Sequence, residues 1–344
     1  MRDMNSVTQR IRELCDIESP TGMTMEASEY VARVLGEMGV ECTRTRKGSV
    51  VACLGGEGAP IALCAHLDTL GLMVSSIKPT GRLKFSHIGG LSDNSVENEN
   101  VRIHTRDGRV YDGTVQCIYA SQHIFSDRNQ CARNLDNMEI VIDEEVRSAD
   151  DVRKLGICNG DFVTLDPRTR VTDSGYIKSR HLDDKASAAL LIELAARVKA
   201  GLFTPARKTY IMFSVYEEVG HGASAGLPED VVDLLAVDMG CVGGDMDGDE
   251  TRVSIAAKDS GGPYEYTMTT RLIELAREKN LDFAIDVFTA YGSDAATALR
   301  AGRDIRYALI GPGVFASHGY ERTHVKGLAN TMELIEAYIS ETSL

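Results

Sequence analysis

The sequence predicts an α/β protein whose chain is interrupted by a small all-β domain. Amphipathic helix patterns occupy both ends of the 344-residue chain, and helix and strand patterns alternate after about residue 166. Between them, short strand patterns separated by turn residues run from about 70 to 165. Residues 1–69 and 166–344 are therefore expected to form one α/β domain, with 70–165 inserted as a β-barrel or sandwich. The length also fits about two domains.

The N-terminal region predicts two helices followed by two strands. Residues 19–22 (Ser-Pro-Thr-Gly) separate two stretches with apolar residues at helical spacing. These residues are Val7, Ile11, Leu14 and Cys15, then Ala27, Val31, Val34, Leu35 and Met38. Strand patterns follow at 49–54 and 61–66. The GGEGAP turn between them lacks the spacing and the Lys-Ser/Thr pair of a phosphate-binding loop.

The predicted secondary structure changes twice along the rest of the chain. From 70 to 165 the turns Pro79-Thr80-Gly81, Asp107-Gly108 and Asp112-Gly113 separate short strands, and one brief helix is expected near 150–155. Beyond this segment, apolar patterns predict helices around 187–198, 268–276 and 332–339, and strands around 209–215, 234–237 and 307–310. This alternation supports the α/β prediction.

Composition excludes several classes of function. The formal net charge is −14 and no lysine or arginine cluster opposes it, so we expect no nucleic-acid partner. The eight cysteines form no CxxC pair, which favours reduced, mostly buried thiols. The N-terminus lacks an apolar core of signal-peptide length, and no run of about 18 apolar residues occurs. We therefore expect a cytoplasmic protein with no membrane partner.

Residues that commonly bind metals follow the predicted core strands. IALCA ends in His66-Leu67-Asp68, IMFSVY ends in Glu217-Glu218, and LLAV ends in Asp238. His318 follows the strand and loop YALIGPGVFAS. The carboxyl ends of strands in an open α/β sheet are where sites are built, because several loops converge there. These side chains are therefore candidates for one shared site.

Asp183 and Asp184 complete the set, directly before the helix predicted from about 186. One of the two is expected to cap that helix, which leaves the other free for a different role. Imidazole and carboxylate ligands together suit zinc, cobalt or manganese. Five such groups with one shared carboxylate suffice for two ions about 3.5 Å apart.

Two further residues are candidates for catalytic roles. Asp68 lies two residues after His66, so on an extended strand its carboxylate is expected to accept the imidazole N–H of His66. Glu217 and Glu218 are adjacent and face different directions. One can therefore bind metal while the other acts as a general base toward water.

Each motif alone also has an ordinary structural explanation. An HxD pair can be a satisfied structural pair, adjacent glutamates often form a solvated surface, and His318 could cap a loop. His123 and His221 read as loop or subunit-contact residues, and His324 is a rival to His318. Gly292-Ser293-Asp294 fits either a pocket wall or a helix cap. Agreement of the strand-end residues in type, order and position favours a shared site.

The motifs AHLDTLG, HLDDK, YEEVG, AVDMG, GSDA and SHGYE resemble those of the family 42 metallo-aminopeptidases, over nearly the whole chain. This family includes the tetrahedral self-compartmentalising enzymes and glutamyl aminopeptidases. The resemblance implies a mixed sheet flanked by helices, as in zinc exopeptidases, and an inserted domain that mediates assembly. Lys185, GHGA after the glutamates, and Ser121-Gln122-His123 depart from the family pattern.

The resemblance also implies roles for individual residues. His66, Asp183 and Asp238 would hold one metal, and Asp183, Glu218 and His318 the other, with Asp183 bridging. Glu217 would be the general base and Asp68 the residue that orients His66. Two divalent ions per subunit, most often zinc or cobalt, would serve the release of N-terminal residues from peptide substrates. A homo-oligomer, a dodecamer or smaller, would form through the inserted domain.

Three other functions remain open at the level of sequence. A two-metal N-acyl amino acid deacylase would use the same ligands on a blocked substrate. A metal-free glycosidase could use two of the carboxylates as acid and nucleophile, although the histidines disfavour it. A non-catalytic assembly protein that only stores metal is the last alternative, and the intact Glu217-Glu218 pair argues against it. The residues that contact a substrate's N-terminal side chain cannot be located from the motifs.

Overall fold

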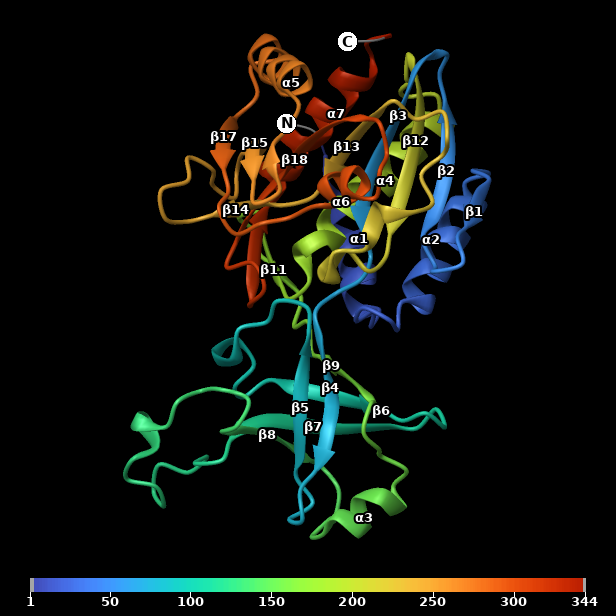
Figure 1. Cartoon of the computed structure of the whole chain (residues 1–344). Helices are drawn as coiled ribbons and strands as arrows, with labels where there is room; N and C mark the ends of the chain where they lie inside the picture. The colour runs from blue at the N-terminus through green and yellow to red at the C-terminus, as the bar shows by residue number, and fades with distance from the viewer. Residues whose placement is uncertain (1–2, 343–344) are drawn as a thin grey trace. The chain divides into compact units, whose positions relative to one another are not determined.

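The computed structural model describes residues 3–342 and divides into two compact units. One unit contains the residues up to 69 together with those from 168 onward, and the other contains 70–167. Figure 1 shows both units with most of their helices and strands labelled. No helix within 3–342 is long and apolar enough to cross a membrane.

A large mixed sheet forms the centre of the first unit. Along its main path the order is β1 (Cys42–Arg44), β2 (Val50–Gly55), β12 (Arg207–Ser214), β3 (Gly58–His66), β13 (Asp233–Val237), β18 (Arg306–Phe315), β19 (Glu321–His324), β11 (Tyr176–Ser179) and β10 (Arg170–Val171). Beside β18 lie β14 (Gly240–Val242) and β15 (Val253–Asp259), and β15 also pairs with β16 (Gly262–Pro263) and β17 (Phe283–Val287). The neighbours β12, β3, β13 and β18 run parallel, so their carboxyl ends lie at one edge.

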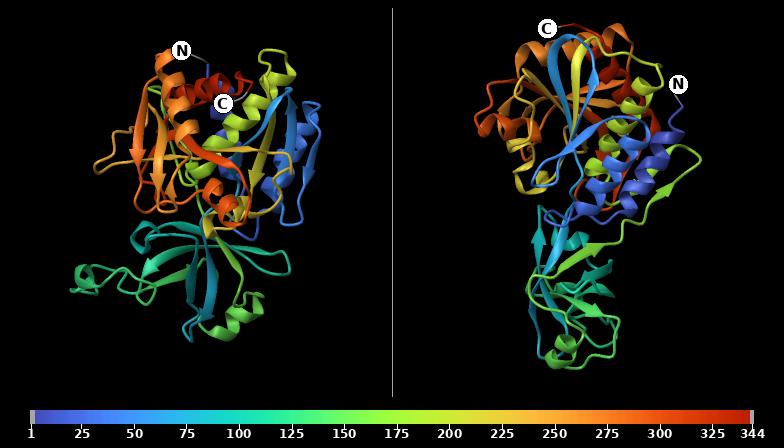
Figure 2. Two further views of the ribbon diagram at one scale, coloured as in Figure 1. Left: turned by 45° about the horizontal axis from the view of Figure 1, so that its top comes forward. Right: turned by 90° about the vertical axis from the view of Figure 1, so that its right-hand side faces the viewer.

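Helices cover both faces of this sheet. One face packs against α1 (Asn5–Asp16), α2 (Met25–Glu37), α4 (Leu182–Lys199), α5 (Tyr266–Glu278) and α7 (Val325–Ile339). The other face packs against α6 (Asp294–Arg300) and the segment before β13. Side chains alternate accordingly: Leu63 and Phe213 join the first core, and Cys64 and Met212 join the second. Figure 2 shows α1, α2 and α4 side by side.

The predicted fold class is confirmed, and so are the long helices and the central strands. The strands β1, β10, β11, β19 and β14 to β17 were not predicted from the sequence, and α6 was expected only as a helix that the Gly292-Ser293-Asp294 motif could cap. These elements have no more than seven residues each, and several strands have only two or three. A segment of that length carries too few alternating positions for its period to be recognised.

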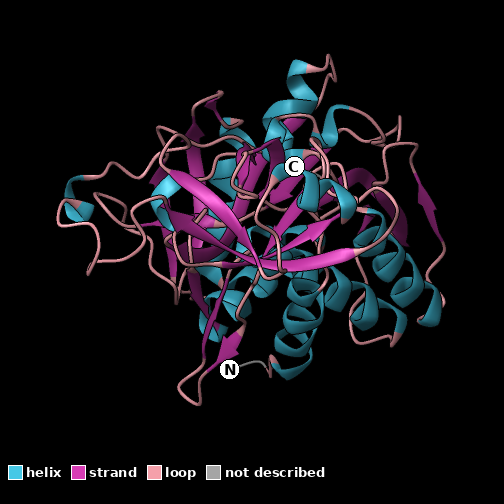
Figure 3. Ribbon diagram, turned by 90° about the horizontal axis from the view of Figure 1, so that it is seen from below, coloured by secondary structure: helices cyan, strands magenta, loops and turns pink. Residues whose placement is uncertain are grey.

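The second unit is a closed six-stranded barrel. Its order is β4 (Gly71–Ile77), β5 (Leu83–Ile88), β8 (Met138–Ile142), β7 (Val110–Cys117), β6 (Asn100–His104) and β9 (Phe162–Leu165). The helix α3 (Ala149–Lys154) precedes β9, as expected near 150–155. Alternate residues of each strand fill the interior, Val115 and Cys117 of β7 among them. Residues 118–137 form a loop between β7 and β8 that contains the short turn η2 (Arg128–Gln130) and extends away from the strands (Figure 3).

Candidate metal centre

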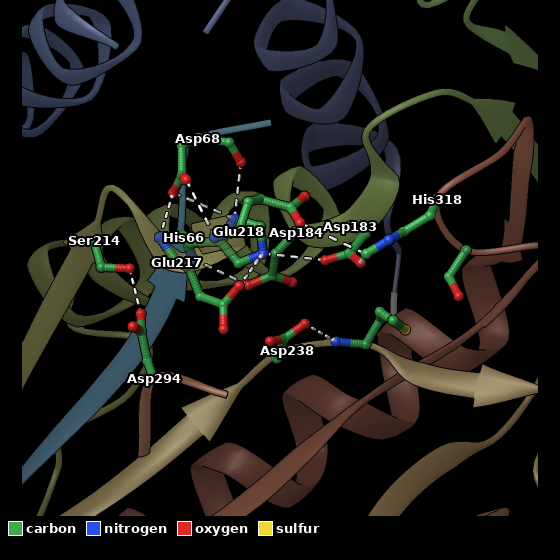
Figure 4. A network of polar contacts seen from close by, with 12 residues as sticks. His66, Asp68, Asp183, Asp184, Ser214, Glu217, Glu218, Asp238, Asp294 and His318 are labelled. Carbon is green, nitrogen blue, oxygen red and sulfur yellow. Dashed lines mark hydrogen bonds and ion pairs between the residues drawn. The ribbon is translucent and has the colours of Figure 1, made fainter. Parts of the chain in front are cut away.

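Six acidic and imidazole side chains meet at the carboxyl edge of the parallel strands. His66 is the last residue of β3, and Asp238 directly follows β13. The chain leaving β12 forms the short turn η3 (Glu217–Val219), which carries Glu217 and Glu218. Asp183, in the first turn of α4, lies between His66 and His318 (Figure 4). Residues separated by up to about 250 positions therefore share one site because their strands are parallel neighbours.

These side chains form two groups with ligand atoms close enough to hold a metal ion. The atoms of His66, Asp183 and Asp238 lie within 4.8 Å of one another, and so do those of Asp183, Glu218 and His318. In the first group, His66 Nε2 is 3.1 Å from Asp183 Oδ1. In the second, His318 Nε2 is 3.4 Å from Asp183 Oδ2 and 3.6 Å from Glu218 Oε2. Asp183 thus faces both groups with different oxygens.

The start of α4 differs from the expected capped helix. His181, in a left-handed conformation, occupies the N-cap position and makes no side-chain capping bond. Asp183 and Asp184 have non-helical backbone angles, and Asp184 Oδ2 accepts a hydrogen bond from the backbone N–H of His66 (3.2 Å). The prediction that one aspartate caps the helix is therefore wrong. Through this hydrogen bond, Asp184 instead connects the start of α4 to the end of β3.

Asp68 also acts differently from the sequence prediction. His66 Nδ1 lies 2.8 Å from the backbone carbonyl of Asp68, whereas the Asp68 carboxylate is 3.7 Å away from it. The carboxylate accepts hydrogen bonds from the backbone N–H groups of Glu217 (3.1 Å) and Glu218 (3.3 Å), and from Thr21 Oγ1 (2.6 Å). Asp68 therefore orients His66 through its main chain and the glutamate turn through its side chain.

Glu217 lies beside the group of His66, Asp183 and Asp238 but is a member of neither ligand group. Its Oε2 is 3.9 Å from His66 Nε2. Burial, together with the negative charge of Asp238, raises the pKa of the Glu217 carboxyl well above its usual range. Glu217 is thus placed to hold or release a proton next to the two groups.

The electrostatics of the centre favour bound cations. Burial raises the pKa of Glu218 well above its usual value, and burial and the charge of Asp183 raise the pKa of Asp238 to about 7. Burial opposes ionisation of Asp183 too, but hydrogen bonds from His318 and His66 outweigh it and lower the pKa of Asp183. Crowded buried carboxylates of this kind are stabilised by divalent cations, and the imidazole and carboxylate donors suit them.

A cavity of about 370 Å³ opens onto the centre. Asp183, Glu217, Glu218, Asp238 and His318 line one part of it. The remaining wall comes from four segments, and its residues are Gly220, Met239, Cys241, Ala290, Tyr291, Gly292, Ser293, Thr297, Arg300 and Ser317. The size suits one amino-acid side chain and the adjoining backbone.

A family model identifies the chain. The model of M42 glutamyl aminopeptidase matches residues 48–334, which is well over half of the sequence. The chain belongs to this family. Aminopeptidase activity, a hydrolase reaction, and dependence on divalent metal ions follow from that membership.

Individual relatives agree with the family assignment. The protein YhfE of Bacillus subtilis (strain 168) is 43% identical over 341 residues, covering 98% of this chain and 99% of its own. A TET aminopeptidase from a marine sediment Thaumarchaeota archaeon has a similar fold, with a TM-score of 0.88 at 19% identity and coverage of 99% and 98%. The Pyrococcus horikoshii TET1 peptidase gives a TM-score of 0.85 at 23% identity, with coverage of 98% and 100%.

The M42 centre does not include the other histidines that the sequence left open. His324 caps α7: its Nδ1 accepts the N–H of Lys326 (3.0 Å) and its Nε2 lies 2.8 Å from the carbonyl of Ser174. His221 is exposed in the loop after the glutamates, and His123 is exposed in the loop of the barrel unit. The structure therefore brings His318 to the ligand groups and leaves these three outside them.

The Gly292-Ser293-Asp294 motif combines its two expected roles only in part. Gly292 and Ser293 line the cavity, and Ser293 sits at the N-cap position of α6 without a side-chain capping bond. Asp294 is buried and accepts hydrogen bonds from Ala223 N (2.6 Å) and Ser214 Oγ. The motif therefore fastens the loop after the glutamates to the end of β12.

Several polar residues that contact the centre were not predicted from the sequence. Thr21 bonds Asp68, Glu321 bonds the backbone of two candidate ligands, and Arg300 lines the cavity. Glu321 lies inside the SHGYE motif, three residues after His318, and that spacing was its one sequence signal. Thr21 and Arg300 lie in a turn and at the end of α6, and neither position follows a core strand.

Proposed function

We propose that this M42 aminopeptidase releases N-terminal residues from peptides with two divalent ions at the centre described above. His66, Asp183 and Asp238 would hold one ion, and Asp183, Glu218 and His318 the other. The observation that carries this proposal is the pair of ligand groups sharing Asp183, with Glu217 beside them and outside both. The ligand types favour zinc or cobalt, with manganese as a further candidate.

Bound cations would supply Lewis acidity toward the scissile carbonyl and lower the pKa of water in the cavity. The protein's own contribution is Glu217, whose carboxylate takes a proton from the attacking water. The same carboxyl then returns the proton to the nitrogen of the leaving amine as the C–N bond breaks. Asp68 supports this step because its carboxylate holds the backbone of Glu217 in place.

The two adjacent glutamates provide the sharpest test of this assignment. Glu217→Gln should lower turnover of an aminoacyl anilide by roughly 10²- to 10⁴-fold, as expected for loss of a general base, while bound metal is retained. Glu218→Gln should instead release metal. Metal content by mass spectrometry and kcat are measured on both variants. Near-normal turnover in the Glu217 variant would contradict the role of Glu217.

Blocked substrates test the type of reaction. An aminopeptidase needs a free α-amino group, so N-acetylated anilides should be inert while the matching free-amine anilides are cleaved. Preferential cleavage of the acetylated substrates would instead support an N-acyl deacylase. The same panel, with and without a chelator, also measures the metal dependence of the activity.

We further propose a preference for acidic N-terminal residues, consistent with the family description. Arg300 lines the cavity, donates a hydrogen bond to Thr297 Oγ1 (3.2 Å), and pairs with no carboxylate of residues 3–342. All four carboxylates lining the cavity belong to the candidate centre, so none is left to receive a basic side chain. The guanidinium can therefore bind a substrate carboxylate through charge-assisted hydrogen bonds.

Substrate preference is measured as kcat/KM for glutamyl, leucyl and lysyl anilides. Arg300→Gln should lower the glutamyl-to-leucyl ratio by roughly tenfold or more, the usual effect of losing a hydrogen bond to a charged group. Arg277→Gln, on the exposed surface of α5, serves as the matched control and should leave the ratio unchanged. An unchanged ratio in the Arg300 variant would refute the preference.

Assembly and location complete the proposal. The Pyrococcus horikoshii relative assembles into a tetrahedron or a large octahedral shell, and we propose a homo-oligomer here as well, a dodecamer or smaller. The loop 118–137 of the barrel unit is the proposed contact, since its Ile124 is 75% exposed. Light scattering should give a smaller molar mass for Ile124→Glu than for the wild type.

Eight cysteines without a disulfide support a cytoplasmic location.

A further inference from the structure

Glu321 contacts the backbone of two candidate ligands at once. It is the first residue of β19 and only 2% exposed. Its Oε1 accepts the N–H of His318 (2.9 Å), and its Oε2 accepts the N–H of Asp183 (3.1 Å). Both ligands belong to the group of Asp183, Glu218 and His318. One buried carboxylate therefore links two segments that are 135 positions apart in sequence.

The pairing of two strands explains why Glu321 lies at this point. β11 and β19 run antiparallel, and Ser179 pairs with Glu321. The chain that leaves β11 after Ser179 reaches Asp183 four residues later, and the chain that enters β19 has passed His318 three residues earlier. Both ligand segments consequently meet beside the first residue of β19. The side chain of Glu321 fills that position.

At both contacts the backbone lies outside regular helix or strand geometry. His318 has φ of 64°, a left-handed conformation that is unfavourable for a residue with a Cβ by about 1–2 kcal/mol. Asp183 has φ of −76° and ψ of 102° inside the first turn of α4 and so departs from the helix. In each case the N–H group is directed to Glu321. The carboxylate thus satisfies donors that a sheet or helix would otherwise satisfy.

We propose that Glu321 is a positioning residue that preforms the metal site of Asp183, Glu218 and His318. It touches neither substrate nor metal, and it acts by fixing the backbone from which Asp183 and His318 extend. Supporting residues of this kind commonly change metal affinity by roughly 10- to 100-fold. The inference rests on the proposed two-metal centre. It states that the metal affinity of the site of Asp183, Glu218 and His318 depends on a residue outside both ligand groups.

Zinc affinity of the loaded protein tests this role directly. Zinc-loaded wild type and Glu321→Gln are titrated with a competing chelator, and released zinc is counted per subunit. The amide keeps one acceptor but places an NH₂ group against the other N–H. The variant should therefore release its more weakly held zinc at a roughly 10- to 100-fold lower chelator concentration. Release curves that superimpose on those of the wild type would overturn the proposal.

Two controls separate positioning from a general loss of structure. Glu336→Gln removes another buried carboxylate, which pairs with Arg197 away from the centre, and it should leave both zinc affinities unchanged. Glu321→Asp keeps the charge but is one methylene shorter, so it cannot reach both N–H groups and should resemble Glu321→Gln. Restoration of wild-type release by the aspartate would contradict the two-point contact.

A measurement on the wild type keeps the proposal testable if Glu321→Gln fails to fold. The amides of Asp183 and His318 should exchange with solvent deuterium more slowly than that of Tyr320 in the zinc-loaded protein, because Glu321 accepts only the first two. Equal exchange at all three would overturn the proposal. A wild type that binds no zinc would instead refute the proposed function, whereas normal binding with an unaffected Glu321 variant refutes only the present inference.

Discussion

The two ligand groups differ in how the protein holds them. His66 is the last residue of the central strand β3, its side chain is 2% exposed, and its Nδ1 bonds the carbonyl of Asp68. His318 lies on a turn after β18, its side chain is 35% exposed, and its backbone is left-handed. The group of His66 is thus fixed by the sheet, whereas that of His318 depends on a turn and on Glu321.

This difference implies two sites of unequal strength. A site whose ligands are already fixed loses less conformational freedom when it binds a cation, so the buried group should hold its ion more tightly. All three ligands of the His318 group line the cavity, where an ion can exchange with solvent, whereas His66 does not line it. We therefore expect stepwise loss of metal during chelation, with the ion of the His318 group leaving first.

Replacing His66 should have the largest effect. His66→Ala removes the imidazole between Asp183 and Asp238 and leaves buried carboxylates with fewer donors to a cation. Zinc affinity of the buried site should fall by more than about 100-fold, the upper end for a merely supporting residue, and anilide turnover should fall to background. Zinc content after dialysis and kcat measure this. Retention of two tightly bound ions would show that the buried group is not a metal site.

Replacing His318 should affect one site and spare the other. His318→Ala leaves His66, Asp183 and Asp238 intact, so the tightly held ion should remain while the exchangeable one is lost. Chelator titration of the variant should show only the late step of the wild-type release curve. Loss of both ions together would mean that the two groups are not independent, and would break the comparison between a sheet-fixed and a turn-fixed site.

The same contrast explains what the sequence could predict. His66, Asp238 and the glutamates follow strands that are continuous apolar runs in the sequence, so their position at the carboxyl edge of the sheet could be inferred from the strand patterns alone. The α/β class and the barrel insert followed from the same periodicities. Which ion each ligand serves, and which of the two glutamates is the general base, came in contrast from the family resemblance.

The parts held by tertiary contacts could not be predicted in this way. Glu321 meets Asp183 only because β11 pairs with β19, and both strands have four residues, too few to show a period. The expected helix cap by Asp183 or Asp184 failed because the first turn of α4 is distorted. The expected carboxylate contact of Asp68 with His66 failed because β3 ends at His66, so Asp68 does not continue the extended strand, and its backbone carbonyl contacts the ring instead.

Replacing Asp68 tests the support of both the strand and the glutamate turn. Asp68→Asn retains the backbone carbonyl that contacts His66 but weakens the acceptor for the N–H groups of Glu217 and Glu218. Turnover should fall by roughly 10- to 100-fold while the zinc of the buried site is retained. The kcat and the zinc content are measured together. Loss of that zinc would show that the carboxylate, rather than the carbonyl, holds His66.

Replacing Thr21 should have the smallest effect, because Thr21 supports the His66 group only indirectly, through Asp68. Its Oγ1 donates to Asp68 Oδ2 (2.6 Å), and both side chains are buried. Thr21→Val has a similar shape and leaves this carboxylate oxygen with the N–H of Glu218 alone. Because hydrogen bonds to charged groups contribute about 1.5–3 kcal/mol, the free energy of unfolding should fall by about that amount.

Denaturant unfolding of the zinc-loaded protein measures this loss, and Thr21→Ser, which retains the hydroxyl, is the matched control. Turnover should change far less in Thr21→Val than in Asp68→Asn, since the N–H contacts of the carboxylate survive. If the valine variant instead lost as much turnover as Asp68→Asn at unchanged stability, Thr21 would be fixing the glutamate turn itself. The sheet-fixed group would then depend on a turn as closely as the His318 group does.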